Sequence, residues 1–534
     1  MKTKHILMVI GVLALAAIMV ATPGVASAQK RGGTLVMLVQ PEPPNLAAYT
    51  TTSAPVGMVA AKVYDGLAEY NFDLKPVPSL AESWDISPDG KTITFKLRKD
   101  VQFHDGKPFT SADVKFTVLE VLKKFHPRGA ATFRDVTAID TPDPHTAIFR
   151  LQTPAPYLMM ALSGYESPMV PKHLFENTDI RNHPNANVPI GTGPFKFVEW
   201  NRGQYVRLDR NPNYWKKGQP YLDRVVVRFI PDSATRTAAL EKGEAHFAGM
   251  GAIYYSDVRQ LEKLPNIAVT TKGYEMSSPL VELYFNTKKK PFDDPKVRQA
   301  ISYAIDRQVV IDNVWFGFGK PATGPFNSNF STVGFYTDKV KNYNVPNGIE
   351  IANKLLDEAG YPRGANGIRF EIVHDLTPYG EEWRRFGEYV QQVLERLGIK
   401  ATLRYEDVAS WLRRVFTTYE FDLTNTWIQN LADPVIGIHR EYHSDFIRPG
   451  TVFVNASRWS SPETDKLMDQ AMVEPDPAKR AALYHEFQKL VVDAAPVVWV
   501  HELKFSTVTD KALKDAVVSP LGVFSNFDRA YFDK

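Results

Sequence analysis

Cysteine is missing from the whole chain of 534 residues. Its absence excludes a disulfide framework and a thiolate metal site, and it removes the lipidated cysteine that tethers many exported proteins. The formal charge is also small, +3 at pH 7. So small a charge predicts no general attraction to nucleic acid or to an anionic membrane surface.

A long apolar run occurs only at the start of the chain. Lys2 and Lys4 precede the apolar segment Ile6 to Val20, and Ala26-Ser-Ala28 follows it. This pattern predicts a secretory signal peptide over residues 1–28, with an uncleaved anchor as the alternative. Its removal leaves 61 basic residues against 60 acidic ones, a formal charge of +1. No later run approaches the roughly twenty apolar residues of a membrane span, so we expect an exported, periplasmic protein without a lipid anchor.

Signatures of common enzymes are also missing. The sequence has no Gly-x-Ser-x-Gly elbow, no P-loop and no dinucleotide-binding fingerprint. A secreted hydrolase would need a catalytic constellation of this kind, and we find none. We therefore predict a protein that is not an enzyme and that needs no cofactor.

The length exceeds what one hydrophobic core usually organises, so at least two lobes are expected. Strand and helix patterns alternate along the chain, as in an α/β fold, and the turn Ser87–Gly90 predicts a β-hairpin. Expected strands cover 34–39, 81–86, 92–97, 369–373, 400–405 and 497–500. Expected helices cover 59–70, 111–122, 234–242, 297–305, 349–359, 381–397 and 477–494.

A series of closely spaced motifs resembles one protein family. The first block contains Leu80-Ala-Glu-Ser-Trp84, Ser87-Pro-Asp-Gly90, Phe95-Lys-Leu-Arg98, Val101-Gln-Phe-His-Asp-Gly-Lys-Pro-Phe109 and Ala112-Asp-Val114. Later motifs are Gly191-Thr-Gly-Pro-Phe-Lys196, Asn211-Pro-Asn-Tyr-Trp215, Pro291-Phe-Asp-Asp294, Ala304-Ile-Asp-Arg307 and Leu356-Asp-Glu-Ala-Gly-Tyr361. Together they are similar to the extracellular solute-binding proteins of ABC importers, family 5, which is the peptide-, nickel- and opine-binding type. The similarity spans nearly the whole mature chain.

The resemblance implies a bilobal periplasmic-binding-protein fold of type II, with two α/β lobes joined by a two-strand hinge. Lobe I is expected at 29–283, with an extra subdomain at about 60–185, and lobe II at 284–500. Residues 501–534 return to lobe I, with hinge crossings near Leu283–Phe285 and Trp499–Leu503. A ligand held between the lobes closes them, and the permease subunits recognise the closed form. We expect a monomer without a nucleic-acid partner.

The segment from Trp427 to Pro434 carries the strongest candidates for ligand binding. In the peptide-binding branch of the family, a Trp is followed three residues later by an Asp that pairs with the α-ammonium of the ligand. Here Trp427 is present, but Asn430 stands at the aligned position. An amide supplies no charge to a buried ammonium, so the resemblance argues against the usual peptide-amine contact. Ordinary loop packing is the alternative role for both residues.

Other candidates come from a polar loop and from the expected hinge. The loop Tyr49–Ser53, with Thr52, matches the place where family members offer hydroxyl or backbone groups to the ligand; a solvated turn is the alternative. Glu282 and Tyr284 flank the expected hinge and are candidates to face the cleft. Tyr379 is a similar candidate in lobe II. Lobe II also contains several arginines, so an anionic ligand stays an alternative.

His439 and His443 have the i, i+4 spacing that places two imidazoles on one helix face. The nickel-binding branch uses a histidine in this part of the chain, which keeps His443 in view. No third ligand is evident, so we predict a surface pair and no metal site. The leading hypothesis is a receptor for a small organic solute, either an oligopeptide or a peptide-like or modified compound; a receptor for a nickel chelate is the alternative.

Overall fold

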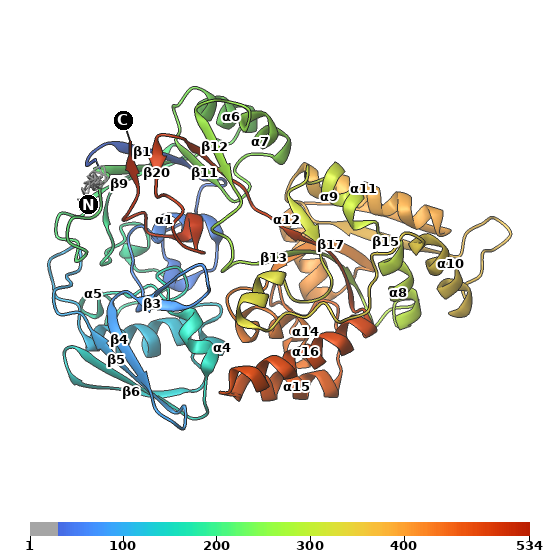
Figure 1. Cartoon of the computed structure of the whole chain (residues 1–534), viewed down its shortest axis with the longest axis horizontal. Coiled ribbons are helices and arrows are strands. Elements are labelled where there is room, and N and C mark those ends of the chain that lie inside the picture. The colour runs from blue at the N-terminus through green and yellow to red at the C-terminus, as the bar shows by residue number, and fades with distance from the viewer. Residues whose placement is uncertain (1–29, 534) are drawn as a thin grey trace, which may run out of the picture.

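Two large β-sheets divide the chain into two lobes (Figure 1). The computed structural model describes residues 30–533, and the predicted signal peptide lies outside this range. Both ends of the described chain lie in lobe I, at the left of Figure 1. Within residues 30–533, no helix has the length and apolar character needed to cross a membrane.

Lobe I is built on a seven-stranded sheet with the order β12-β19-β11-β1-β10-β9-β8. Its central strand β1 pairs in parallel with β10 and β11 and buries Leu35 and Met37 on one face, as a half-buried strand should. The strands are β1 (Thr34–Leu38), β8 (Phe195–Asn201), β9 (Tyr205–Arg210), β10 (Arg224–Arg228), β11 (Phe247–Gly249), β12 (Ile267–Thr270) and β19 (Thr507–Asp510). The helices are α1 (Ala54–Ala60), α6 (Ser233–Glu241) and α7 (Tyr255–Leu261).

A smaller antiparallel sheet with the order β4-β5-β7-β6 forms the extra subdomain of this lobe. Its strands are β4 (Ala81–Ile86), β5 (Thr92–Leu97), β6 (Val136–Asp143) and β7 (Thr146–Leu151), beside the short pair β2 (Ala68–Tyr70) and β3 (Pro76–Pro78). Its helices are α2 (Ser111–Phe116), continued by a π turn η2 (Thr117–Leu122), α3 (Lys123–Phe125), α4 (Gly129–Thr132), the 3-10 helix η3 (Pro156–Ala161) and α5 (Lys172–Phe175).

Lobe II contains a six-stranded sheet with the order β14-β18-β13-β17-β15-β16. Its strands are β13 (Pro279–Phe285), β14 (Gly319–Pro321), β15 (Phe370–Leu376), β16 (Ile399–Tyr405), β17 (Leu423–Gln429) and β18 (Val497–Leu503). Its helices are α8 (Pro295–Ala304), α9 (Arg307–Asn313), α10 (Gly348–Glu358), α11 (Glu381–Arg396), α12 (Val408–Arg413), α13 (Pro434–Gly437), α14 (His439–Tyr442), α15 (Pro462–Val473) and α16 (Pro477–Ala494). β13 and β18 lie side by side and every residue of both is buried.

All but one of the expected strands and helices are confirmed, with ends that differ by a few residues. The helix expected over 59–70 is wrong: α1 covers Ala54–Ala60, and Ala68–Tyr70 form β2. Gly66, between them, packs so tightly that a Cβ atom there would lie 2.2 Å from the Leu162 carbonyl oxygen. α1 ends six residues earlier, at Ala60, and the apolar spacing of 59–70 gives no sign of this close backbone contact.

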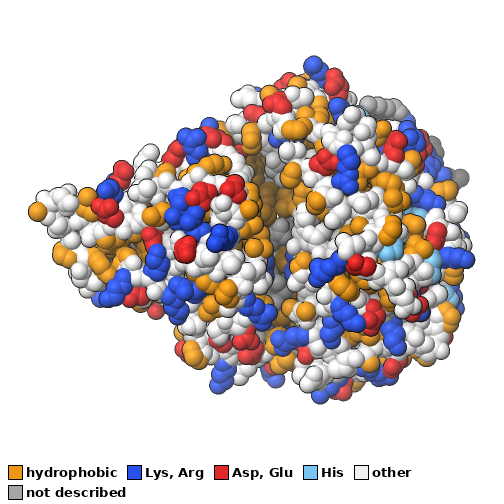
Figure 2. Space-filling model, turned by 180° about the vertical axis from the view of Figure 1, so that it is seen from behind, with side chains coloured by type: hydrophobic (Ala, Val, Ile, Leu, Met, Phe, Trp, Pro, Cys, Tyr) orange, Lys and Arg blue, Asp and Glu red, His pale blue; other side chains and the backbone are white. Residues whose placement is uncertain are grey.

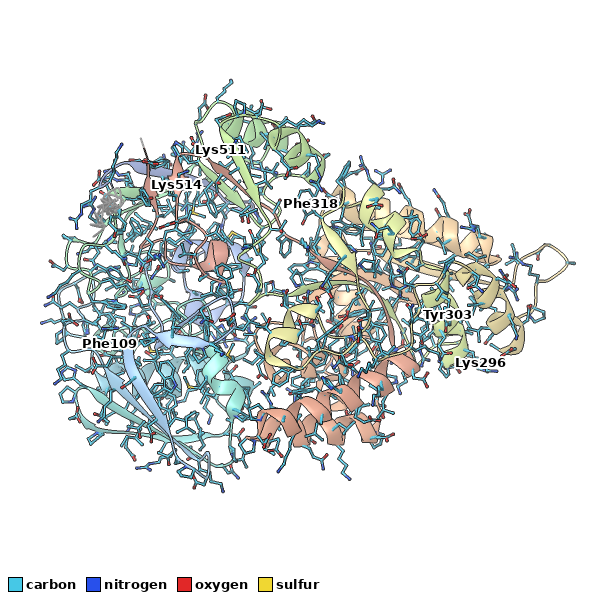
Figure 3. All side chains as sticks on the ribbon, viewed as in Figure 1. Phe109, Lys296, Tyr303, Phe318, Lys511 and Lys514 are labelled. Atoms are coloured by element: carbon cyan, nitrogen blue, oxygen red, sulfur yellow. The ribbon has the colours of Figure 1, made fainter. Side chains whose placement is uncertain are left out.

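The chain crosses between the lobes at residues 271–278 and 504–506, because β12 and β19 belong to the lobe I sheet while β13 and β18 belong to the lobe II sheet. Both crossings lie a few residues outside the segments expected from the resemblance, which fall within β13 and β18. Close to the second crossing, α7 of lobe I contacts lobe II. The Arg259 Nε donates to the Phe316 carbonyl oxygen at 2.9 Å, and its guanidinium lies 4.2 Å from the ring centroid of Phe318. Phe318 is labelled in Figure 3.

Candidate ligand-binding cleft

A groove runs between the two lobes (Figure 2). On the lobe I side its wall comes from the extra subdomain, through α4 and η3. On the lobe II side it comes from α13, α14 and the loop that follows them. η3 packs against α13 and α15, so the lobes touch here and enclose cavities between them.

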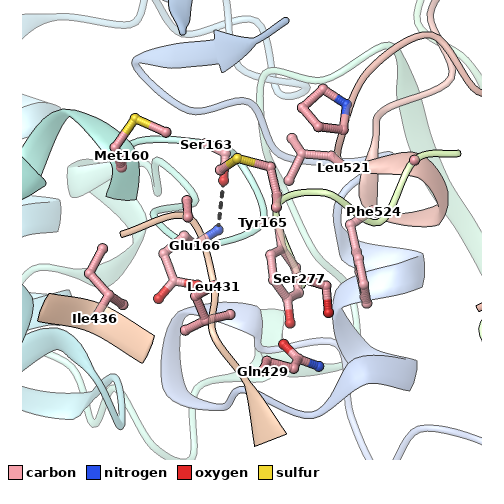
Figure 4. Close-up of a pocket in the computed structure, with 14 residues that line it drawn as sticks. Met160, Ser163, Tyr165, Glu166, Ser277, Gln429, Leu431, Ile436, Leu521 and Phe524 are labelled. Carbon is pink, nitrogen blue, oxygen red and sulfur yellow. Dashed lines mark hydrogen bonds between the residues drawn. The ribbon is translucent and has the colours of Figure 1, made fainter. Parts of the chain in front are cut away.

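The cavity nearest the hinge has a volume of about 30 Å³ and is lined from both lobes and from the first crossing (Figure 4). Tyr165 and Phe524 of lobe I stack with ring centroids 4.2 Å apart. The Tyr165 hydroxyl, Ser277 and Gln429 point toward one another in Figure 4. The Ser277 hydroxyl is buried without a hydrogen-bond partner, and buried polar groups usually have one. The Ser277 hydroxyl therefore has unused hydrogen-bonding capacity beside this cavity.

A larger cavity of about 480 Å³ continues the groove away from the hinge. Ile436 lines both cavities. Between them, Arg128 holds Glu166 through two parallel hydrogen bonds of 2.5 Å; Glu166 lines the hinge-side cavity and Arg128 lines the outer one. A cavity of this volume is typical of a small-molecule site.

Trp427 and Asn430, the strongest candidates from the sequence, lie on different sides of their segment. Trp427 is half-buried on β17. Its ring is edge-on to the Phe505 ring, and the two ring centroids lie 5.5 Å apart. Asn430 is fully buried. Its Oδ1 accepts a hydrogen bond from the Asn327 backbone N–H at 2.7 Å, and its Nδ2 donates one to the Pro325 carbonyl oxygen at 3.1 Å. These contacts fit the loop-packing alternative, and a ligand contact through Asn430 stays a prediction.

Strand geometry explains this separation. Successive side chains of a strand point to opposite faces, so Trp427 and Gln429 share one face of β17 while Ile428 points to the other, where it joins the core of lobe II. Gln429 lines the hinge-side cavity. Gln429 was not predicted from the sequence, although the same alternation, counted from Trp427, places it on this face.

The polar loop before α1 also contains one buried candidate and one that lines the groove. Tyr49 is fully buried with its ring edge-on to Phe175 at 5.1 Å, and burial raises the pKa of its hydroxyl. Thr52 lines the outer cavity. Ser53 directly precedes α1, and its backbone N–H donates to the Thr51 hydroxyl. Of the three candidates in this loop, Thr52 is thus the one on the groove.

Glu282 and Tyr284 are buried inside lobe II, next to Glu441 of α14. The Tyr284 hydroxyl donates to the Glu441 Oε1 at 2.6 Å, and the Tyr442 hydroxyl lies 3.4 Å from the Glu282 Oε1. Burial first, and then the neighbouring Glu441, raises the pKa of Glu282. The two carboxyl groups form a buried pair in the core of lobe II, and neither lines the two cavities described above.

Tyr379 and the two histidines take up other places in lobe II. Tyr379 is 38% exposed and packs edge-on against Trp411 at 5.7 Å. The predicted surface pair is wrong, because His439 and His443 are both buried. The His439 Nε2 lies 3.1 Å from the Tyr484 hydroxyl, and the His443 Nδ1 accepts from the Asp445 backbone N–H. Within the described range, no three side chains of His, Cys, Asp or Glu lie close enough to hold a metal ion.

Asp433 supports the loop that carries these residues. Its Oδ1 accepts from the Val435 amide at the start of α13, and both its oxygens accept from the Arg480 guanidinium at 2.7 and 2.8 Å. Both side chains are almost fully buried. A charge pair of this geometry fixes α13, and with it Ile436, against α16.

The family model for bacterial extracellular solute-binding proteins, family 5, matches residues 75–445. The chain belongs to this family. As a family 5 member, it is the solute-binding component of an ABC importer, and the bilobal fold expected from the sequence is confirmed by its structural neighbours.

Three relatives illustrate the similarity. The glutathione-binding protein GsiB of Pectobacterium atrosepticum is 29% identical, over 88% of each chain. The structure of AgaA from A. tumefaciens R10 in complex with agropinic acid has a TM-score of 0.76 at 29% identity, covering 94% of this family 5 chain and 99% of AgaA. DppA from Helicobacter pylori in complex with the peptide STSA has a TM-score of 0.79 at 27% identity, covering 95% and 99%.

Proposed function

We propose that this protein is a periplasmic receptor that captures a small peptide-like organic solute in the groove between its lobes and delivers it to the permease of an ABC importer. The predicted signal peptide supports export, and the absence of cysteine supports a protein without a lipid anchor. We further propose that it works as a monomer and does not convert its ligand chemically.

The groove is the proposed ligand site because it combines enclosed volume with available polar groups. The outer cavity offers about 480 Å³, and the unpartnered Ser277 hydroxyl and Gln429 offer hydrogen bonds near the hinge. A few polar groups in a largely apolar pocket are typical of small-molecule recognition. Glutathione, agropinic acid and a tetrapeptide, bound by the relatives, are all small polar organic compounds.

Closure about the two crossings is the proposed means of capture. Residues 271–278 and 504–506 carry the chain between the lobe I and lobe II sheets, and hinge changes usually concentrate in such short segments. A ligand favours the closed arrangement only as far as it binds that arrangement better than the open one. A ligand that contacts both walls of the groove meets this condition.

Thermal unfolding and titration calorimetry test the proposal with four probes: the peptide Ser-Thr-Ser-Ala, glutathione, agropinic acid and nickel–histidine. A ligand at 100 times its Kd adds about 2.7 kcal/mol to the free energy of unfolding, so binding raises the melting temperature clearly. We expect an organic probe to bind. Gln429→Ala should weaken that binding, whereas Gln308→Ala, an exposed change on α9, should not.

Each of the other outcomes contradicts part of the proposal. Stabilisation by nickel–histidine alone makes the protein a metal-chelate receptor. Turnover of a probe by the purified protein makes it an enzyme. Binding that is indifferent to Gln429→Ala removes the hinge-side cavity from the ligand site.

A further inference from the structure

The outer cavity of the groove has an unusual distribution of charge. Three arginines line it, Arg128 from lobe I and Arg440 and Arg448 from lobe II, and none of its lining residues is Asp or Glu. The remaining walls are mainly apolar, with Tyr157, Ile436 and other side chains. A cleft lined by one sign of charge concentrates ligands of the opposite sign.

Arg440 is the more enclosed of the two lobe II arginines that line this cavity. Its guanidinium donates at 3.0 Å to the carbonyl oxygens of Gly437, Phe453 and Gln429. Since a guanidinium has five N–H donors, two remain. Among the described residues, no carboxylate forms an ion pair with Arg440; burial, and then the nearby Arg128, lowers its pKa to about 10. Three backbone carbonyl oxygens stabilise its charge, and Glu441 and Glu166 are near enough to favour that charge without pairing with it.

The other two arginines differ in how far their charges are balanced. Arg128 is neutralised by its double hydrogen bond to Glu166. Arg448 is exposed at the rim, where its Nε donates to the Asp445 carbonyl oxygen and its guanidinium lies 4.8 Å from the Phe446 ring centroid. It forms no ion pair with any described residue. Arg440 and Arg448 thus line the cavity without an ion-pair partner among the described residues.

A neighbouring cavity of about 240 Å³ helps to place the anion-binding end. It shares Arg448 with the outer cavity, but Asp445 and Asp469 also line it. These carboxylates repel an anion there. The outer cavity, which has none, is the better place for a negative group.

We infer that the outer cavity binds the carboxylate of an organic anion, with Arg440 and Arg448 as its partners and an apolar part of the ligand against Tyr157 and Ile436. This inference rests on the proposed function and names the chemical class of its solute. A planar guanidinium suits a carboxylate because two parallel N–H groups match its two oxygens.

Matched acid and neutral probes test the inference by titration calorimetry. The pairs are N-acetyl-Phe-Glu with N-acetyl-Phe-Gln-amide, and glutathione with its dimethyl ester. We expect at least one acid to bind tenfold or more tightly than its neutral partner. A hydrogen bond to a charged group contributes about 1.5–3 kcal/mol. Arg448→Gln should therefore lower the affinity for that acid about 10- to 100-fold.

Two further variants separate a binding role from a structural one. Arg396→Gln removes one exposed positive charge at the end of α11, outside the cavity, and should leave affinity unchanged. Arg440→Lys keeps the charge but loses the fork that holds three carbonyl groups. Arg440→Lys should lower the affinity for the acid and leave the affinity for the neutral partner unchanged. A merely structural loss would lower both affinities.

The inference is overturned if each acid binds no more tightly than its neutral partner. It is also overturned if Arg448→Gln binds the acid as tightly as the wild-type protein does. The absence of binding by both acids overturns it as well. In each case the proposed function survives if Ser-Thr-Ser-Ala or another organic probe of the earlier panel binds, and it falls if no organic probe binds.

Discussion

Replacing Asn430 with aspartate tests the contact between two loops of lobe II. The Asn430 side chain is fully buried and accepts from the Asn327 amide while donating to the Pro325 carbonyl oxygen. Aspartate retains the first contact, but its second oxygen then faces the Pro325 carbonyl, which is another acceptor. We therefore expect Asn430→Asp to lower the free energy of unfolding.

The size of this loss follows from hydrogen bonding and from proton uptake. Loss of a buried hydrogen bond that leaves a partner unsatisfied costs about 1–3 kcal/mol. The new carboxyl avoids the repulsion by taking up a proton, which for an ordinary pKa of about 3.9 costs about 4.9 kcal/mol at pH 7.5 and about 0.8 kcal/mol at pH 4.5. We expect a loss of about 2–5 kcal/mol at pH 7.5. Because burial raises the pKa of the new carboxyl in the folded state, the loss grows as pH rises above about 3.9.

Urea unfolding followed by tryptophan fluorescence at pH 7.5 and 4.5 measures the effect. Asn430→Ala is the control, since it loses both hydrogen bonds but adds no titratable group, and its loss should be the same at both pH values. Unchanged stability of Asn430→Asp at pH 7.5, together with tighter binding of peptides with free amino termini, would refute the reasoning. That result would show that the side chain faces the ligand.

Two further variants test the buried charges of lobe II. Because burial and Glu441 raise the pKa of Glu282, the folded protein retains a proton that the unfolded chain releases above about pH 4.3. Wild-type stability should therefore fall as pH rises toward the folded pKa, and Glu282→Gln should show a smaller fall in melting temperature between pH 4.5 and 8; an identical pH profile contradicts this. Arg480→Met leaves Asp433 buried without its cation and should cost about 3–5 kcal/mol in urea unfolding. Adding Asp433→Asn should recover part of that loss, and no recovery would mean that the packing, rather than the charge, is responsible.

Much of the fold could be predicted because it depends on local patterns. The turn Ser87–Gly90 and its flanking strands, and the long amphipathic helix α11, appear with almost the expected bounds. Apolar spacing failed over residues 59–70, where the backbone at Gly66 packs against Leu162. The crossings also lie a few residues away from the expected positions, because the expected segments belong to the fully buried strands β13 and β18.

The binding residues were harder to predict. Among the residues that line the two cavities, Thr52 was named, but Ser277, Gln429 and Arg440 were not. Ser277 lies in a crossing with no regular period. Arg440 lies in the short helix α14, directly after α13, which the Asp433–Arg480 pair holds in place. Neither position carries a sequence pattern that distinguishes it from an ordinary surface residue.

The sequence by itself determined the family, the alternation of strands and helices, and the expectation of export, since each of these is written in neighbouring residues. Only the tertiary structure decided which side chains face the groove. Residues from four distant segments, near 128, 165, 277 and 440, meet there, and their meeting depends on how two lobes pack about the crossings. The charge of the outer cavity follows from the same packing, because Glu166 pairs with Arg128 and Arg440 lines the cavity without an ion pair to a described residue.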